Sequence, residues 1–234
     1  MKKKMQRFAE METFPNVIQP AFDEVFGKQH RLKGNWAGSE FLNPNPLILE
    51  LGCGKGEYTV GLARRHAEKN FIGIDIKGSR MWRGAKTAVD EGVKNTRFLR
   101  THIEMINSFF APDEVDEIWI TFPDPQLKKK RKRLTSPGFL SRYSLFLRNN
   151  GLVHLKTDND VLYGYTYDLA VLNGFTIRFS TTDLYSSGIE GTAVEIQTFY
   201  ERQFLSQGMK INYLCFELPH GKEILEPEDD KPEG

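Results

Sequence analysis

The chain has 234 residues, a length that suits one domain with a sizeable core. Its 32 basic residues nearly balance 31 acidic ones, so the distribution of charge tells more than the total. Two cysteines are too few for a disulfide framework or a cysteine-based zinc site, and the five histidines lack metal-ligand spacing. No apolar run approaches the ~20 residues of a membrane span. We therefore expect a cytoplasmic protein with no membrane segment and no metal.

From residue 47 onward, short apolar runs alternate with segments of helical spacing. The expected strands are 47–51, 71–76, 96–101, 117–122, 152–157, 175–181 and 211–218. The expected helices are 57–69, 79–92, 137–151 and 161–174. Such alternation is typical of an α/β fold in which right-handed crossovers join parallel strands. The expected domains are an N-terminal extension that is partly flexible (1–46), a main domain (47–218) and an acidic, disordered tail (219–234).

The stretch LELGCGKGEY (49–58) places glycines directly after the first expected strand and before a helix. Glycines such as Gly52 and Gly54 let the chain turn tightly and let a ligand approach the backbone closely. In open α/β sheets, ligands bind at this end of the strands. By themselves, the glycines are equally consistent with an ordinary strand–helix turn.

Two carboxylates accompany the glycine turn. Asp75 ends the next strand, where a carboxylate can accept both ribose hydroxyls of a nucleotide, although it could instead cap a helix. Glu50 is a charge inside an apolar run, and a buried carboxylate there can face a cationic or amino-bearing ligand. NAD-binding fingerprints normally have an apolar residue at that position and the spacing G-x-G-x-x-G. The spacing G-x-G-x-G after an acidic strand end favours S-adenosylmethionine, which carries an amino acid and a sulfonium.

Two further acids follow expected strands at the same edge. Asp124 lies in FPDP and Asp158 in LKTD. A helix N-cap is an alternative interpretation for Asp158, whereas the prolines on both sides of Asp124 hold an extended turn that aims its side chain. This arrangement suits a positioned catalytic group.

Six consecutive cations, Lys128–Arg133, begin just after Asp124. Taken alone, such a run is more often a solvated surface or, in a eukaryote, a nuclear signal. Its place beside the ligand edge of the sheet favours a surface that attracts a polyanion and positions it through phosphate contacts. No signature of a known RNA-recognition module accompanies the run.

The stretches LELGCGKGEY, FIGID, FPDPQLKKKRKRL, HLKTD and TFYERQF occur in this order and at this spacing. Over residues 47–218, the chain thereby resembles the bacterial tRNA (guanine-N7-)-methyltransferases. The resemblance implies a Rossmann-like class I methyltransferase fold, of the α/β class, with a mostly parallel seven-stranded sheet and helices on both faces. It also implies S-adenosylmethionine as cofactor and a variable-loop guanine of tRNA (guanine-46) as target. We expect a monomer or a homodimer.

The resemblance assigns roles to individual positions. Asp124 matches the central carboxylate, near both cofactor and guanine. The expected cofactor contacts are Glu50, Gly52, Gly54, Asp75, His102 and Asp124. The expected substrate contacts are Lys128, Asp158, Thr198, Phe199, Tyr200 and Glu201. The expected RNA phosphate contacts are Lys129, Lys130, Arg131, Lys132 and Arg133. The chain departs from the family at two points: His102 replaces the usual Asp or Asn, and PDPQ replaces a PDPW-type motif before a slightly shorter basic segment.

The chemistry fits these residues. Guanine N7 has a lone pair and no proton to lose, so its methylation needs no general base, and a nearby carboxylate can stabilise the cationic ring. We expect Asp124 to do this with help from Asp158. Two alternatives remain open: an exocyclic-amine methyltransferase on another RNA, whose usual Asn/Asp-Pro-Pro-aromatic turn FPDP only partly matches, and a non-catalytic cofactor-binding or RNA-binding protein.

Overall fold

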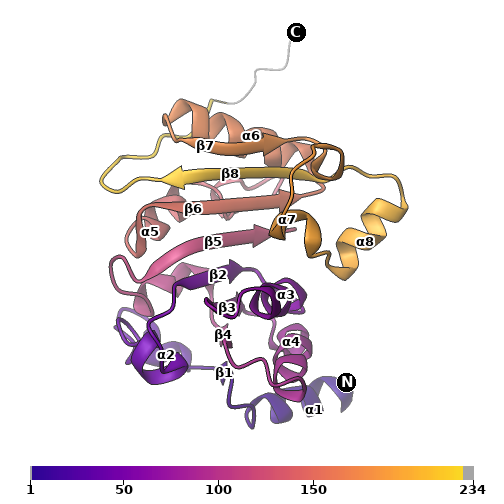
Figure 1. Ribbon diagram of the computed structural model, residues 1–234. Helices are drawn as coiled ribbons and strands as arrows, with labels where there is room; N and C mark the ends of the chain where they lie inside the picture. The colour runs from indigo at the N-terminus through magenta and orange to yellow at the C-terminus, as the bar shows by residue number, and fades with distance from the viewer. Residues whose placement is uncertain (1, 229–234) are drawn as a thin grey trace.

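Eight strands form one sheet in the computed structural model, which describes residues 2–228 (Figure 1). All neighbouring strands are parallel except β8, which runs antiparallel between β6 and β7. From one edge to the other, the strands are β1 (Val17–Ile18), β4 (Thr96–Arg100), β3 (Asn70–Asp75), β2 (Leu47–Leu51), β5 (Val115–Thr121), β6 (Leu147–Thr157), β8 (Asn212–Leu218) and β7 (Ile177–Thr181). The predicted α/β class is confirmed, with the short β1 as an eighth strand beyond the seven expected.

Helices cover both faces of the sheet (Figure 1). The helices are α1 (Lys2–Met11), α2 (Phe22–Val25), α3 (Glu57–Arg65), α4 (Gly78–Asp90), α5 (Pro137–Tyr143), α6 (Asp160–Leu172), α7 (Thr192–Glu195) and α8 (Phe199–Ser206). Short π and 3-10 turns span Ala37–Phe41, Ile103–Ser108, Lys130–Lys132 and Leu184–Ser186.

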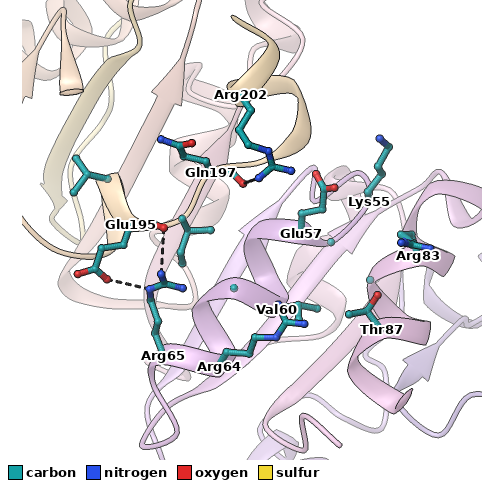
Figure 2. A pocket seen from close by; sticks show the side chains of 15 residues that line it. Lys55, Glu57, Val60, Arg64, Arg65, Arg83, Thr87, Glu195, Gln197 and Arg202 are labelled. Atoms are coloured by element: carbon teal, nitrogen blue, oxygen red, sulfur yellow. Dashed lines mark hydrogen bonds and ion pairs between the residues drawn. The ribbon is translucent and has the colours of Figure 1, made fainter. Parts of the chain in front are cut away.

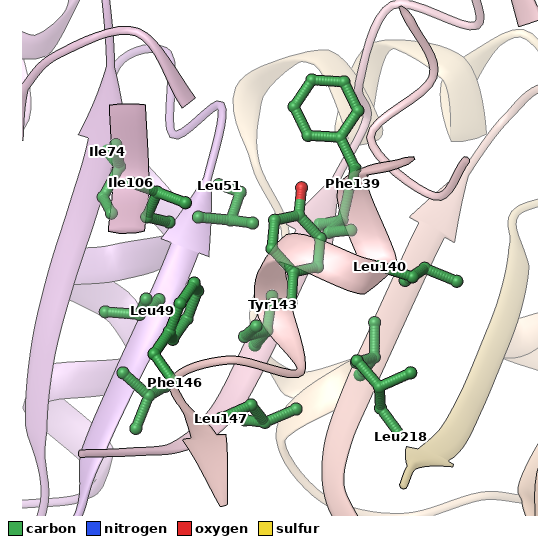
Figure 3. Packing of buried hydrophobic residues seen from close by; sticks show 14 of the residues in the cluster. Leu49, Leu51, Ile74, Ile106, Phe139, Leu140, Tyr143, Phe146, Leu147 and Leu218 are labelled. Carbon is green, nitrogen blue, oxygen red and sulfur yellow. The ribbon is translucent and has the colours of Figure 1, made fainter. Parts of the chain in front are cut away.

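The side chains of β2 point alternately to the two faces of the sheet, so they contribute to two separate parts of the hydrophobic core. Every residue of this strand is buried, which explains why it reads as a continuous apolar run. Leu49 and Leu51 belong to the same buried cluster as residues of α5 and α6, and Figure 3 shows Leu51 beside Tyr143 and Leu49 beside Phe146. Ile48 points to the opposite face, where it packs with α3. Central strands buried on both faces hold their carboxyl ends in fixed positions.

The helix predicted over 137–151 is wrong in its second half. α5 ends at Tyr143 and β6 begins at Leu147, whose partner across the sheet is Val115 of β5. The pairing shifts register before Leu152, and Asn150 adopts φ 58° in the intervening bulge. Residues 144–146 therefore form a turn and 147–151 belong to a bulged strand, because pairing with β5 overrides the local preference for helix.

The N-terminal segment and the start of the tail pack onto the main domain. β1 adds to the sheet edge beside β4, and the buried Trp36 donates from Nε1 to Phe109 O at 2.9 Å. Ile224 is buried in the core, and Tyr165 donates to Glu226 at 2.7 Å. The extension and tail expected from the sequence are thus attached to the sheet and to α6 over the described residues, while 229–234 lie outside them.

Candidate active site

A cleft of about 410 Å³ opens at the carboxyl ends of β2, β3 and β5. We call it the main cleft. Its walls are the glycine turn after β2, the end of β3, the turn that follows β5 and the start of α8. The residues that line it include Glu50, Gly52, Gly54, Asp75, Thr121, Phe122, Asp124, Gln126, Lys132, Thr198 and Tyr200. The ends of β2, β3 and β5, which the sequence predicted to meet at one edge, therefore do meet there.

The glycine turn depends on left-handed backbone. Gly52 and Gly54 have φ of 75° and 54°, a region that side chains with a Cβ rarely adopt. Gly56 also has positive φ, and a Cβ at this position would come within 2.5 Å of the Phe98 ring. The turn does join a strand to a helix, as the simpler interpretation held, and it also forms one wall of the main cleft.

Asp75 is held at the cleft by two backbone groups. Its Oδ2 accepts from Gly54 N at 2.9 Å and its Oδ1 accepts from Lys77 N at 2.7 Å. The carboxylate therefore links the glycine turn to the start of α4. A carboxylate has about four acceptor positions, so both oxygens can still accept a ligand hydroxyl.

Glu50 lies almost fully buried on the floor of the cleft, 2% exposed. Its Oε2 accepts from the backbone N of Thr59 at 2.8 Å and from the Thr59 hydroxyl, while its Oε1 accepts from the Thr121 hydroxyl at 2.7 Å. Burial raises the pKa of Glu50 to about 7, although the hydrogen bonds from both threonines oppose this shift. The carboxylate braces the start of α3 against β5 and keeps one acceptor position on Oε1.

The turn after β5 presents Asp124 at the rim of the cleft. Phe122 and Gln126, which bracket the PDP sequence, have φ of 49° and 47°, unusual values for residues other than glycine. Asp124 is exposed, and its Oδ1 accepts from Gln126 N at 3.0 Å. Strained backbone of this kind persists where surrounding contacts hold it and is common at active sites. The backbone N of Phe122 donates a hydrogen bond to Lys156 O at 2.8 Å, which anchors the turn to β6.

A buried ion pair attaches α8 to the sheet. Lys156 and Glu201 have fully buried side chains, with Lys156 Nζ 2.7 Å from Glu201 Oε1. The same ammonium donates to Ala193 O at 2.6 Å and to Ile196 O at 3.2 Å, so its three donors all have partners. Burial lowers the pKa of Lys156, and the Glu201 charge opposes this. The pair holds the α7–α8 segment against β6, which places Thr198 in the main cleft.

The four residues Thr198–Glu201, all expected at the substrate, fall into different positions. Thr198 and Tyr200 line the main cleft, and Phe199 and Tyr200 are 48% and 44% exposed. Glu201 faces inward and is 0% exposed. It accepts from the Tyr185 hydroxyl at 2.6 Å and forms a capping box with Thr198. Its expected substrate contact is therefore replaced by a structural role in this arrangement.

The cations of the basic run also differ in their exposure to solvent. Lys128, Lys129, Arg131 and Lys132 are exposed, and Lys132 reaches the main cleft. Arg133, in contrast, is only 2% exposed. Its Nε donates to Pro125 O at 3.1 Å, and its guanidinium lies 4.3 Å from the centre of the Tyr165 ring. Arg133 thus braces the turn that carries Asp124, and the expected phosphate contact is not available to it in this conformation.

Two expected site residues lie beside the main cleft. His102 is exposed and lines a neighbouring compartment of about 280 Å³ that shares Asp75 with the main cleft. Asp158 lines a separate pocket of about 550 Å³ with Lys210 and Asn212, so the structure does not bring it to Asp124. The neighbouring Asn159, which accepts from Leu162 N, is the N-cap of α6 in place of Asp158.

Several cleft residues escaped prediction because they are chemically ordinary. Thr121 ends β5 and binds Glu50, and Leu134 lies across the glycine turn. Lys55, inside the glycine turn, places its ammonium 4.2 Å from the centre of the Phe199 ring. Only the position of Lys55 between two glycines could have drawn attention to it. Within residues 2–228, no group of three or more potential metal ligands is found, and no helix could cross a bilayer.

Comparisons with known proteins agree with this geometry. The methyltransferase family model Methyltransf_4 matches residues 44–214. A tRNA (guanine-N(7)-)-methyltransferase of Bacteroides fragilis is 48% identical over 97% of this chain and 90% of its own length. A protein of the same name from Christiangramia forsetii is 52% identical over 93% of this chain and 98% of its own. Another from Porphyromonas gingivalis is 53% identical, covering 89% and 86% of the two chains.

Solved structures show the same fold at low sequence identity. The 16S rRNA methyltransferase KamB superposes with a TM-score of 0.61 at 15% identity, over 82% of this chain and 95% of that one. A 16S rRNA (adenine(1408)-N(1))-methyltransferase variant from Catenulisporales acidiphilia, described with its cosubstrate SAM, gives 0.52 at 14% identity, over 85% and 93%. The family model and the three relatives match most of the length of this chain. The chain therefore belongs to the family of tRNA (guanine-N7-)-methyltransferases.

Proposed function

We propose that this protein transfers the methyl group of S-adenosylmethionine to N7 of guanine-46 in the variable loop of tRNA. The observation that carries the proposal is the position of Asp124, exposed at the rim of a cleft whose floor and walls are the glycine turn, Asp75 and Glu50. A cofactor held by the cleft would be reached from this rim.

The residues of the main cleft fit the cofactor. Two left-handed glycines expose backbone along one wall, and the Asp75 oxygens keep free acceptor positions for the two ribose hydroxyls. Glu50 and Asp124 add negative charge at the end where a sulfonium and an ammonium would lie. The compartment lined by His102 continues past Asp75 and can take the adenine ring.

S-adenosylmethionine supplies an electrophilic methyl group on a positively charged sulfur. The chain needs no general base, because the attacking N7 carries a lone pair and no proton. Asp124 stabilises the positive charge that the guanine ring gains and accepts hydrogen bonds from its N–H edge. Thr198 and Tyr200 narrow the entrance and orient the base, which contributes through proximity. We assign Asp158, which lines a separate pocket, to a contact with the RNA beyond the base.

The exposed cations Lys128, Lys129, Arg131 and Lys132 hold the RNA backbone beside Asp124 through phosphate contacts that read no sequence. Selection of the guanine then depends on tRNA shape and on the cleft, and a stacked target base must leave its stack to reach Asp124. We place this activity in the cytoplasm, where tRNA is modified, and expect a monomer or a homodimer, which sedimentation velocity distinguishes.

The test is incubation of the full chain with unmodified tRNA and methyl-labelled cofactor, followed by nucleoside analysis and mapping of the modified position. N7-methylguanosine at position 46 supports the proposal. A different methylated nucleoside would indicate an exocyclic-amine methyltransferase, and RNA binding without methyl transfer would indicate a non-catalytic protein. Substitution of guanine-46 in the tRNA should abolish the signal and is the matched control.

A further inference from the structure

A second groove, larger than the main cleft, lies between α3, α4 and the α7–α8 segment (Figure 2). Its volume is about 640 Å³. We call it the α3–α4 groove. Its charged lining consists of five cations and two carboxylates, namely Lys55, Arg64, Arg65, Arg83, Arg202, Glu57 and Glu195. Neither the sequence motifs nor the proposed mechanism uses these arginines.

The acidic residues of the groove are already engaged. Glu195 pairs with Arg65 at 3.0 Å, as the dashed lines in Figure 2 show. Glu57 accepts from the backbone N of Phe199 at 2.9 Å. At the lower end, Arg64 pairs with the exposed Glu91. The carboxylates therefore stabilise the groove walls and leave its upper end with an excess of positive charge.

Three cations surround that upper end, each from a different element. Figure 2 shows Arg83 on α4, Arg202 on α8 and Lys55 in the glycine turn around Glu57. Among the described residues, Arg83 is exposed and has no carboxylate within ion-pair distance, and Arg202 donates from Nη1 only to Gln197 O, at 2.5 Å. Both guanidinium groups thus keep donors for an external anion.

The groove adjoins the main cleft. Lys55 and Glu57 line both cavities. The Lys55 ammonium lies 4.2 Å and 5.0 Å from the centres of the Phe199 and Tyr200 rings, two half-exposed aromatics at the cleft entrance. Cations along a groove followed by exposed aromatic rings are the pattern that single-stranded nucleic acids require, because phosphates and base faces alternate along the strand.

We propose that the α3–α4 groove binds the sugar-phosphate backbone of the tRNA strand that carries the target guanine. The inference rests on the proposed function, since it takes tRNA as the substrate. The basic run Lys128–Arg133 and this groove reach the main cleft at different residues, Lys132 and Lys55, so each holds the strand on its own side of the reacting base. A groove of about 640 Å³ with cations at both ends suits an extended polyanion better than one compact phosphate group.

The test uses the full chain and Arg83→Glu, with binding of unmodified tRNA measured by fluorescence anisotropy at several KCl concentrations. Loss of one phosphate contact and the added repulsion should weaken binding about 10-fold and lower the salt slope by about 0.9. Because Arg83 lies outside the main cleft, cofactor affinity should stay unchanged, and KM for tRNA should rise more than kcat falls. Lys94→Glu, an equal change of charge on the exposed turn after α4, is the control and should bind tRNA normally.

If wild type forms N7-methylguanosine but Arg83→Glu keeps full tRNA affinity and salt slope, the groove proposal is overturned while the proposed function stands. If wild type methylates no tRNA, the proposed function fails first. If Arg83→Glu weakens only the binding of inorganic phosphate, the groove is a site for a small anion. If it changes only the sedimentation coefficient, the groove is a contact with a second copy of the chain. Either result also overturns the proposal. Should Arg83→Glu lower Tm, Arg83→Gln repeats the test with an expected loss of about 3-fold.

Discussion

The main cleft and the basic run beside it are adjacent, but they are built in opposite ways. In the cleft, Asp75 and Glu50 are each held by two or more hydrogen bonds from the protein. Along the run, Lys128, Lys129 and Arg131 are exposed to solvent. Fixed groups orient a reacting pair of atoms, whereas solvent-exposed cations hold a polyanion with little demand on geometry. The two regions should therefore respond differently to substitution.

The difference also separates catalysis from affinity. Variants of the cleft should alter turnover or cofactor binding at any salt concentration, because groups in direct contact with a bound ligand are little screened by salt. Variants of the exposed cations should alter tRNA affinity and its salt dependence and leave turnover alone.

The largest effect is expected for Asp124→Asn. Loss of the carboxylate removes the charge that stabilises the cationic guanine, so the turnover rate should fall about 100-fold to 1,000-fold. Cofactor affinity, measured by calorimetry, should fall much less than the turnover rate, because the glycine turn, Asp75 and Glu50 remain in the main cleft. Asp158→Asn is the matched comparison, since it alters a carboxylate in the neighbouring pocket and should raise KM for tRNA more than it lowers kcat. Near-normal turnover in Asp124→Asn would refute the role assigned to this residue.

The second effect concerns the attachment of α8. Lys156→Met leaves the Glu201 carboxylate buried and unpaired, which should lower the free energy of unfolding by about 3 kcal/mol. Urea unfolding measures this loss. Arg178→Met breaks the ion pair between the 59% exposed Arg178 and Glu217, and should cost less than about 1 kcal/mol. Equal losses in the two variants would show that the buried pair does not hold the α7–α8 segment.

Much of the fold could be predicted because hydrophobic pattern and glycine placement act locally. The runs at 47–51 and 71–76 became β2 and β3 almost unchanged, since strands buried on both faces have continuous apolar sequences. The bulge around Asn150 could not be predicted, because pairing with β5 decides it and that partner is distant in sequence. Local preference alone favoured a longer helix there.

In the candidate site, too, some residues could be predicted from the sequence and others could not. Asp75 and Asp124 could be predicted, because Asp75 ends β3 and Asp124 follows β5, and both strands end at the ligand edge. The burial of Arg133 and Glu201 could not, since it depends on Tyr165 and Lys156, which other elements supply. A run of like residues in a sequence says nothing about which member turns inward.

The third effect tests how the cleft responds to pH. Because burial raises the pKa of Glu50 to about 7, a bound cation should favour the ionised form, and cofactor affinity should rise about tenfold between pH 6 and pH 8. The free protein should behave in the opposite way. A carboxyl with a raised pKa contributes stability below its unfolded pKa and loses it as pH rises through 7.

The measurement is calorimetric titration of wild type and Glu50→Gln with the cofactor across this range. Ionisation of the cofactor itself affects both proteins equally, so the difference between them isolates Glu50. A pH dependence that is identical in the two proteins would show that this carboxyl does not titrate near pH 7 or does not interact with the bound cation.

The smallest effect separates two neighbouring arginines of the basic run. Arg131→Ala removes an exposed cation and should weaken tRNA binding about 3-fold at low salt, with Tm unchanged. Arg133→Ala removes the hydrogen bond to Pro125 O and the contact with Tyr165, which should lower the free energy of unfolding by about 1 kcal/mol. Because that hydrogen bond braces the turn of Asp124, the second variant should also lose turnover while its tRNA salt slope stays normal. The reverse assignment of the two phenotypes would show that Arg133 leaves its buried position to contact RNA.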